Sequence, residues 1–357
     1  MLVTLRLALV GLGTWAATGH LPVYAGARLR EHVEVVALCS RDRAKAHAWA
    51  DARGIPGAYD NLEQLLDETV PDVVAVCTPD DAHVTPALAA LSAGCDVLLE
   101  KPLATTLKGA LAILEASKAT GRTVVTLLHK RADALWAEAA ARVATGRYGP
   151  LQAGTILIEN PLTVPNGDYF TSELATRTDP NHFLGTHVYD LLRYITGLDP
   201  HRVSARRYEG RLAADGIATA DSYKADIEMH GGASVSILCA WNLPTASPAL
   251  TKQTMHLHFE DGELELDGTR RGFIEHGPDG YNYVNPYFLR STPAGPVGYG
   301  ALFIEEAVFS LTKKAPSAID LPTLEDAWWA TAVAEAVATS AESGTNVEVQ
   351  QSLGAAL

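Results

Sequence analysis

Glycines that follow an apolar segment are the first residues whose spacing suggests chemistry. Residues 5–10 are apolar apart from Arg6, and Gly11, Gly13 and Ala16 come next in the pattern Gly-x-Gly-x-x-Ala. The first glycine of this pattern allows a tight strand-to-helix turn, the second lets the backbone approach a pyrophosphate, and the small third residue allows close helix–strand packing. Glycines also occur in such turns for purely steric reasons. The position between a strand-like and a helix-like segment favours a dinucleotide site made by Gly11, Gly13, Thr14, Trp15 and Ala16.

The end of the second apolar segment, 33–39, bears on the type of dinucleotide. A carboxylate there would hold the ribose 2′-hydroxyl of NAD. Ser40 occupies that position and Arg41 follows it, while Asp42 is placed to cap the next helix. A small hydroxyl beside an arginine accommodates a 2′-phosphate, so we expect NADP(H) to be favoured over NAD(H). The alternative is that Arg41 is a solvated loop arginine and that both cofactors are accepted.

Short apolar segments alternate with helix-like ones through the first third of the chain. The apolar segments are rich in valine and leucine without clear polar alternation, as strands buried on both faces are, and they are 5–10, 33–39, 73–77, 97–99 and 123–128. Segments of helical period lie between them at 42–53, 62–68, 82–93 and 105–119. This alternation predicts an α/β Rossmann domain, a doubly wound parallel sheet, over residues 1–129.

The pattern changes after residue 129. A helix is expected at 133–145, and longer, more alternating strands at 151–158, 217–229, 234–241, 255–259 and 263–266. One helix, 186–196, interrupts these strands, and residues 160–180 and 277–300 have the composition of loops. We expect a C-terminal α+β domain with an open, mostly antiparallel sheet over 130–320. A last helix, 324–343, lies in a segment 321–357 that is expected to return toward the first domain.

Composition excludes several classes of partner. The 357 residues carry 28 Lys and Arg against 42 Asp and Glu, a net charge of −14. An acidic surface repels phosphate backbones and anionic lipids, so no nucleic-acid or membrane partner is expected. The four cysteines form no Cys-x-x-Cys pair and no ligand run with histidine, which predicts neither disulfides nor a metal site. No apolar stretch approaches the roughly 18 to 20 residues of a membrane span, and we expect a thiol-reduced, cytoplasmic protein.

Three further motifs, together with the glycine fingerprint, resemble those of a known family. Thr78-Pro79-x-x-x-His83 follows one predicted strand, Glu100-Lys101-Pro102 follows the next, and Gly-x-His187-x-x-Asp190-Leu-Leu lies in the second half. In this order and spacing they resemble the Gfo/Idh/MocA oxidoreductases, over nearly the whole chain. The resemblance implies a sugar or polyol substrate and a homodimer or homotetramer. It also implies cofactor contacts by Thr78, Pro79, His83, Glu100 and Lys101.

The resemblance gives Lys101 a part in proton transfer, and its position supports this. A lysine at the carboxyl end of a strand, near a nicotinamide cation, loses proton affinity and can relay a proton from a substrate hydroxyl. Pro102 fixes the chain direction and Glu100 can orient the ammonium; the alternative is a surface Lys–Glu pair of little energetic value. For His83 the alternative is a histidine that only packs. Trp15 either walls the nicotinamide or substrate pocket or packs against the C-terminal helix.

The same resemblance points to a histidine and a carboxylate on one helix of the second domain. His187 and Asp190 are i and i+3 and share a helix face, so the carboxylate can orient the imidazole. An unperturbed pKa of about 6.5 suits imidazole to general acid–base work. We expect His187, beside Lys101, to take or give the hydroxyl proton. The alternative is a histidine that is satisfied within a domain interface.

Phe183 departs from the family pattern, because many members carry Asp four residues before this histidine. Asn181, His182 or Asp179 from the same loop could supply the missing polar contact, and their spacing does not choose among them. Phe183 itself could shape a less polar pocket. Lys130 resembles a basic family residue, which either lines the cleft or neutralises the acidic surface. Lys130, Asn181, His182 and Phe183 are the candidate substrate residues.

These residues predict an NAD(P)-dependent oxidoreductase that transfers a hydride between nicotinamide and a sugar, polyol or keto-sugar carbon. Two other classes stay open. One is an NAD-dependent glycoside-cleaving enzyme that oxidises the sugar transiently, and the other is a non-catalytic dinucleotide sensor. Glu100, Lys101 and His187 argue against the sensor, because a sensor needs no proton-transfer groups.

Overall fold

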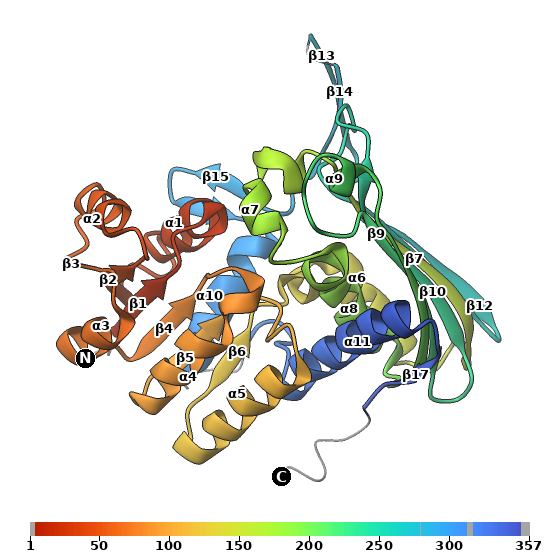
Figure 1. Cartoon of the computed structure of the whole chain (residues 1–357), viewed down its shortest axis with the longest axis horizontal. Helices are drawn as coiled ribbons and strands as arrows, with labels where there is room; N and C mark the ends of the chain where they lie inside the picture. The colour runs from red at the N-terminus through yellow and green to blue at the C-terminus, as the bar shows by residue number, and fades with distance from the viewer. Residues whose placement is uncertain (1–3, 279, 313–316, 351–357) are drawn as a thin grey trace. The chain divides into compact units, whose positions relative to one another are not determined.

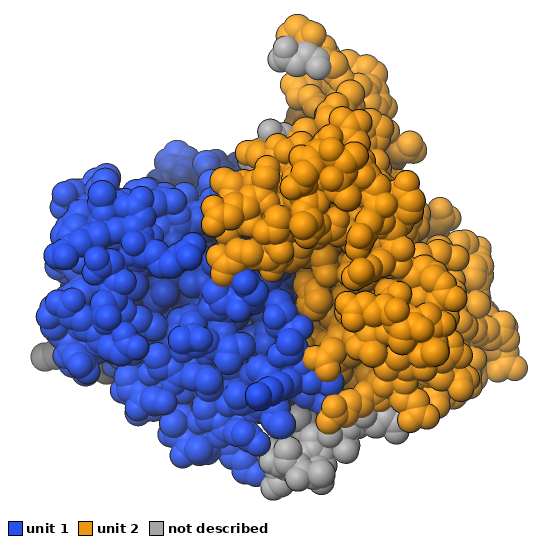
Figure 2. Space-filling model, viewed as in Figure 1, with its two compact units in different colours: residues 1–132, 287–328 blue, residues 133–286, 329–357 orange. Residues whose placement is uncertain are grey.

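The structure is a computed structural model that describes residues 4–278, 280–312 and 317–350 (Figure 1). Contacts divide the chain into two compact units, residues 1–132 with 287–328 and residues 133–286 with 329–357 (Figure 2). The first unit thus includes residues 287–328, whereas the sequence pattern assigned 287–320 to the second domain. Helix α11 (Leu324–Ser343) begins in the first unit and continues in the second.

A six-stranded sheet forms the centre of the first unit. All its strand pairs are parallel, and the order is β3-β2-β1-β4-β5-β6. The strands are β1 (Leu5–Val10), β2 (Val33–Cys39), β3 (Gly57–Tyr59), β4 (Val73–Val76), β5 (Asp96–Leu99) and β6 (Val124–Thr126). This is the strand order of the dinucleotide-binding Rossmann fold, and it confirms the predicted fold class. Residues 7–10 of β1, all of β4 and residues 97–99 of β5 are buried, as strands covered on both faces must be.

Helices of the first unit begin at side-chain caps. Asp42, Asn61 and Thr106 each accept a hydrogen bond from the backbone N–H three residues later. The helices are α1 (Leu21–Tyr24), α2 (Arg43–Asp51), α3 (Leu62–Thr69), α4 (Val84–Ser92), α5 (Leu107–Thr120) and α10 (Tyr299–Leu311). Helix α10 was not predicted from the sequence. It places Phe303 and Ile304 in one buried apolar cluster with side chains of β1.

The second unit contains a seven-stranded mixed sheet in the order β12-β11-β7-β10-β9-β8-β17. Only the pair β7–β10 is parallel, so the prediction of an open, mostly antiparallel sheet is confirmed. The strands are β7 (Leu151–Pro161), β8 (Pro200–Tyr208), β9 (Ser222–Met229), β10 (Ser234–Leu243), β11 (Lys252–Phe259), β12 (Gly262–Asp267) and β17 (Val347–Glu348). Strand β8 was not predicted, and β9 begins later than the expected residue 217.

One face of this sheet is covered by helices of its own unit. Along β9, Tyr223, Ala225 and Ile227 are buried, while the intervening Lys224 and Asp226 are exposed. Figure 1 shows α6 (Ala134–Val143) and α8 (Thr186–Thr196) on the same side of the sheet. The shorter helices α7 (Ser172–Ala175) and α9 (Arg211–Ala214) and the later part of α11 belong to the same unit.

Two segments expected to be loops contain regular structure. Strand β7 extends through Pro161, and α7 lies within 160–180. Residues 277–300 include strands of two hairpins, formed by β13 (Phe273–Gly277) with β14 (Gly280–Val284) and by β15 (Arg290–Thr292) with β16 (Gly295–Val297). The loop prediction was therefore wrong in both segments. These hairpins bury little apolar surface, so their composition resembles that of a loop.

Within residues 4–278, 280–312 and 317–350, no helix combines the length and the apolar character needed to cross a bilayer.

Candidate functional site

The glycine turn after β1 has the two properties that its sequence pattern predicts. Gly11 has φ +95°, and a Cβ there would lie 2.5 Å from the carbonyl oxygen of Cys77. At Gly13, by contrast, a Cβ would meet no protein atom within 4 Å. Packing therefore explains the first glycine but not the second. An exposed backbone with space in front of it is what the approach of a pyrophosphate requires, so this turn fits a dinucleotide.

The helical segment after the turn includes a π-helical turn at Ala16–His20, which leads directly into α1. Ala16 is buried in the apolar cluster under the sheet, as expected for the third small residue of the fingerprint. A Cβ on Gly19 would lie 2.8 Å from the Trp15 indole, so that glycine makes room for the tryptophan. Single-turn π insertions are frequent at functional sites.

At the end of β2, the residues that bear on the ribose are a serine and an arginine. The Ser40 hydroxyl accepts a hydrogen bond from the backbone N–H of Asp42 (3.2 Å), and the Asp42 carboxylate caps α2 as expected. Arg41 is exposed. No acid stands at the strand end, where NAD-specific sites place one.

Glu100, directly after β5, connects the glycine turn to the strand that precedes Lys101. Its Oε1 accepts from the Trp15 indole N–H (2.8 Å) and lies 2.9 Å from His20 Nε2. His20 Nδ1 is in turn 2.8 Å from the Tyr24 hydroxyl. With its proton on Nε2, the imidazole donates to Glu100 and accepts from Tyr24. The Trp15 side chain is thereby fixed within the fingerprint.

This network keeps the Glu100 carboxylate charged. Burial by itself would raise the pKa of Glu100, but the hydrogen bond from His20 and the positive charge of Lys101 outweigh this effect, and the pKa lies below its usual value. Lys101 is itself only 9% exposed. Lys101 and Glu100 are therefore not a pair of surface residues, the alternative that the sequence left open, because both side chains are largely buried.

Aromatic rings form a cluster beside the same turn. Trp15 stacks on Phe288 with ring centroids 5.5 Å apart, and His129 lies 5.4 Å from Phe288 and 6.1 Å from Tyr299. Burial, helped by the charge of Lys130, lowers the pKa of His129 to about 3. The ring is therefore a neutral aromatic surface at pH 7. Lys130 is half-buried in the short turn that His129 begins.

His83 joins the two loops that follow β4 and β5. The side chain is fully buried, and its ring nitrogens lie 2.6 Å from the Pro102 carbonyl oxygen and 3.0 Å from that of Thr78. The Thr78 hydroxyl donates to the Ala82 carbonyl. Thr78 and Pro79 are half-buried. These contacts are those of a positioning residue, as the packing alternative predicts.

Helix α8 carries the histidine and carboxylate of the second unit. The helix begins after Gly185, where a Cβ would lie 2.7 Å from the Tyr189 ring. His187 is 8% exposed and Asp190 3% exposed. Their spacing places both on one face of the helix, close to one another along the axis.

The loop before α8 uses its polar groups in two ways. The Asn181 amide donates to the Ala334 carbonyl of α11 and accepts from the Tyr189 hydroxyl, so both of its ends hold the fold together. His182 Nδ1 lies 3.0 Å from Asp179, which also accepts from Tyr223. Burial would raise the pKa of Asp179, but the charge and hydrogen bonds of His182 lower it below its usual value.

Phe183 lies in an aromatic cluster rather than in a polar one. Its ring centroid is 5.2 Å from that of Phe170, 6.0 Å from Trp241 and 6.2 Å from Tyr169. A carboxylate at this position would face these rings.

Several residues around the two predicted sites had no role in the sequence analysis. His20, His129 and Phe288 surround Trp15, and Tyr223 and Trp241 surround the loop before α8. For His20, the signal was the segment His20-Leu21-Pro22 after the fingerprint, which resembles a His-x-Pro motif of the family and was interpreted as structural. The others come from distant parts of the chain and share no spacing with the motifs.

Family models match both halves of the chain. The model described as "Oxidoreductase family, NAD-binding Rossmann fold" matches residues 5–128, and the "GFO/IDH/MocA C-terminal domain" matches residues 136–265. The chain therefore belongs to the GFO/IDH/MocA oxidoreductase family.

Individual relatives agree with this assignment. The chain is 26% identical over 354 residues to an inositol 2-dehydrogenase of Pseudarthrobacter chlorophenolicus, covering 97% of this chain and 96% of that protein. It is 30% identical over 193 residues to the D-glucoside 3-dehydrogenase of Escherichia coli, a match that spans about half (54%) of each protein. A scyllo-inositol dehydrogenase from Lactobacillus casei, solved with NAD(H) and scyllo-inositol, has the same fold, with a TM-score of 0.77 at 16% identity over 97% of this chain and 99% of that one.

The two fingerprint glycines can be separated experimentally. Gly13→Ala should leave the free energy of unfolding nearly unchanged, because the new methyl group meets no protein atom, but should weaken NADPH or NADH binding about tenfold or more, equivalent to about 1.4 kcal/mol. Gly11→Ala should instead destabilise the fold by about 2 kcal/mol or more, since it adds a clash at positive φ. Fluorescence titration and urea unfolding measure the two effects. Unchanged affinity in Gly13→Ala would contradict the site.

The Glu100 network predicts a pH-dependent stability. Glu100→Gln should cost about 1.5–3 kcal/mol at pH 7, because it removes a charged hydrogen-bond acceptor. The lowered pKa stabilises the fold above the ordinary carboxyl value of 4.5, and this contribution is lost as the pH falls through the lower folded value. The difference between wild type and variant in urea unfolding should therefore shrink in acid. The exposed Glu115→Gln is the control, and an equal cost at all pH values would refute the network.

Proposed function

We propose that this protein is an NAD(P)-dependent dehydrogenase or reductase that acts on a hydroxyl or carbonyl carbon of a sugar, polyol or keto-sugar. The observation that carries the proposal is the turn at Gly11 and Gly13, open to a dinucleotide, on the same sheet whose strand β5 leads into Glu100 and Lys101. In an open parallel sheet, the carboxyl ends of the strands line the ligand site. The inositol and glucoside dehydrogenases among the relatives support the substrate class.

The cofactor is held by residues of the first unit. The backbone at Gly13 and Thr14 receives the pyrophosphate, and Ser40 and Arg41 receive the 2′-phosphate, so NADP(H) is favoured and NAD(H) is the alternative. Thr78, Pro79 and the Glu100–Lys101 segment contribute further contacts, with His83 positioning the loops that carry them. When bound, the nicotinamide supplies the hydride acceptor or donor.

Proton transfer is assigned to Lys101 and His187. The ammonium of Lys101, enclosed and next to the charged Glu100, hydrogen-bonds the substrate oxygen and holds it in place. His187 takes the proton when the hydroxyl is oxidised and returns it in the reverse direction, with Asp190 orienting the ring. Two buried polar side chains on one face of α8 support this division of work.

Substrate contacts are assigned to Lys130 and to the loop before α8. Because Asn181 is held by Ala334 and Tyr189, we assign it a positioning role, and His182 is the polar residue offered to the substrate. Phe183, with its aromatic neighbours, gives the pocket an apolar wall that suits a deoxygenated or glycosylated sugar. The active form is proposed to be a homodimer or homotetramer in the cytoplasm.

Substitution of the proton-transfer groups tests the mechanism. Lys101→Ala and His187→Ala should each lower kcat about 100-fold or more, because positioned proton transfer contributes about 10²–10⁴, while NADPH affinity changes little. The exposed Lys108→Ala is the control. Turnover is followed at the nicotinamide absorbance band with sugars, polyols and keto-sugars. Normal turnover in both variants would reject the assignment, and sugar release without net change of nicotinamide would indicate glycoside cleavage.

Arg41 tests the choice of dinucleotide. Arg41→Ala should raise the Kd for NADPH about tenfold and leave that for NADH nearly unchanged, since a charged hydrogen bond to the 2′-phosphate is worth about 1.5–3 kcal/mol. Arg43→Ala, exposed on the first turn of α2, is the matched control. Tighter binding of NADH than of NADPH by the wild type would rule out the preference.

A further inference from the structure

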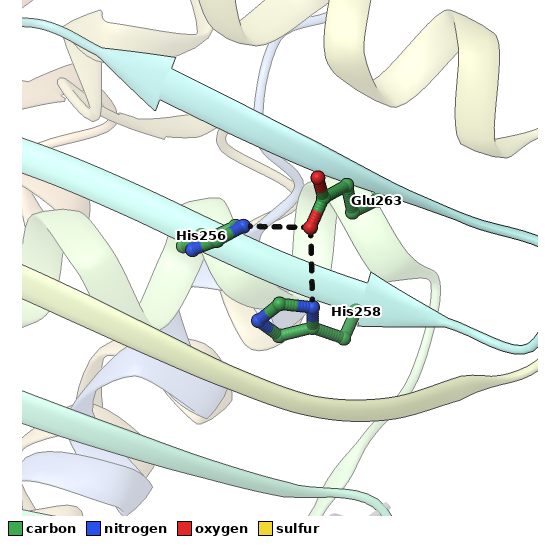
Figure 3. Close-up of side chains that lie close together, drawn as sticks. All are labelled: His256, His258 and Glu263. Carbon is green, nitrogen blue, oxygen red and sulfur yellow. Dashed lines mark hydrogen bonds and ion pairs between the residues drawn. The ribbon is translucent and has the colours of Figure 1, made fainter.

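We propose that His256, His258 and Glu263 form a binding site for a divalent transition-metal ion on the β11–β12 hairpin (Figure 3). The site uses none of the residues assigned to the reaction, and the sequence pattern gave no sign of it. The two histidines are two residues apart on β11, and the carboxylate comes from the next strand. From the sequence alone, this spacing does not show that the three side chains meet, because their positions depend on the register between β11 and β12.

The register brings the three side chains to one face of the sheet. His258 stands directly opposite Glu263, and His256 opposite Glu265. Because side chains alternate across a strand, residues 256 and 258 on β11 and residues 263 and 265 on β12 project to the same side. This is the side opposite to the buried Met255, Leu257 and Phe259.

The distances are close to those that a metal ion imposes. His256 Nε2 is 3.1 Å and His258 Nδ1 is 3.4 Å from Glu263 Oε2, and all three donor atoms lie within 4.8 Å of one another. Ligands of a tetrahedral zinc ion are about 3.4 Å apart, since Zn–N and Zn–O bonds measure about 2.0–2.2 Å. Two of the three separations already have that size, and small side-chain rotations close the third.

The scaffold holds these side chains before any ion arrives. Strand β11 pairs with β12 on one side and with β7 on the other. The hairpin turn is also fixed, because the N–H of Glu260 donates to the Pro150 carbonyl and the N–H of Asp261 to that of Tyr148. Little ordering is then required for binding. The three side chains are 41%, 47% and 64% exposed, so an ion reaches them from solvent.

The donor set selects the class of ion. Two imidazole nitrogens favour Zn²⁺, Ni²⁺ or Cu²⁺ over Mg²⁺ and Ca²⁺, which prefer oxygen ligands. Glu263 supplies one negative charge, and a water or Glu265 fills the remaining position. As plain surface ion pairs these contacts would contribute little, so stability alone does not account for their convergence.

Zinc binding to the untagged, full-length chain tests the proposal. After treatment with EDTA and dialysis, the protein is titrated with Zn²⁺ in competition with a chromogenic indicator, and we expect one saturable site per chain. Loss of an outer-shell partner alone typically weakens metal binding about 10- to 100-fold, so His256→Ala, His258→Ala and Glu263→Gln should each weaken it at least as much. Zinc should raise the thermal midpoint of the wild type and not of these variants.

A second histidine pair provides the control. The rings of His201 and His230 are 5.0 Å apart, but they are not part of any three-ligand group among the described residues. His230→Ala should bind zinc like the wild type. The zinc K-edge spectrum should show two imidazole ligands, and one fewer in His256→Ala. Absence of saturable binding, unchanged affinity in the three ligand variants, or equal displacement by Mg²⁺ would overturn the proposal.

Discussion

The first unit depends on one largely buried carboxylate, that of Glu100. An enclosed charge of this kind is tolerated only when donors surround it, and here they come from Trp15 and His20 of the segment after the glycine turn. These hydrogen bonds therefore fix the distance between the segment that follows β1 and the segment that follows β5. The same charge faces Lys101, the residue that comes next in the chain. Shape and electrostatics of the candidate site thus have a common origin.

In the second unit, buried polar side chains are held by hydrogen bonds to an amide, a carboxylate and a phenol, and aromatic rings pack beside them. Asn181 uses both ends of its amide to hold α8 and α11, and Asp179 holds His182 and Tyr223. Both ends of the Asn181 amide and the Asp179 carboxylate are thus satisfied within the unit. The aromatic cluster around Phe183 then fills the space where a family carboxylate is more usual. The departure is accommodated because the neighbouring rings are equally apolar.

Sequence reasoning succeeded where one signal dominates. Strands β1 and β2 were predicted with their exact limits because buried parallel strands are continuously apolar, and α8 and α11 because glycines end them. Helix α10 was missed, since it is apolar on nearly all sides and follows a glycine-rich segment. Strand β8 was missed because arginines interrupt its alternation. For the candidate site, the fingerprint and the Glu-Lys-Pro motif correctly located the ends of β1 and β5, which carry the site residues of the first unit. The bond from Trp15 to Glu100 joins residues 85 apart, and no local pattern encodes such a pair.

Helix α10 lies late in the sequence but packs in the core of the first unit, and this affects the order of folding. Phe303 and Ile304 share the apolar cluster with Leu7 and Leu9, so that core lacks part of its interior until these residues have been synthesised. The second unit likewise needs Ala334 to hold Asn181 and Ser340 to bond to Ala205. During synthesis on the ribosome, domains made first usually fold first. Here both units need residues from the last sixth of the chain, so both complete their folding at nearly the same time. The chain must therefore keep both partly formed sheets from aggregating until its last helix emerges.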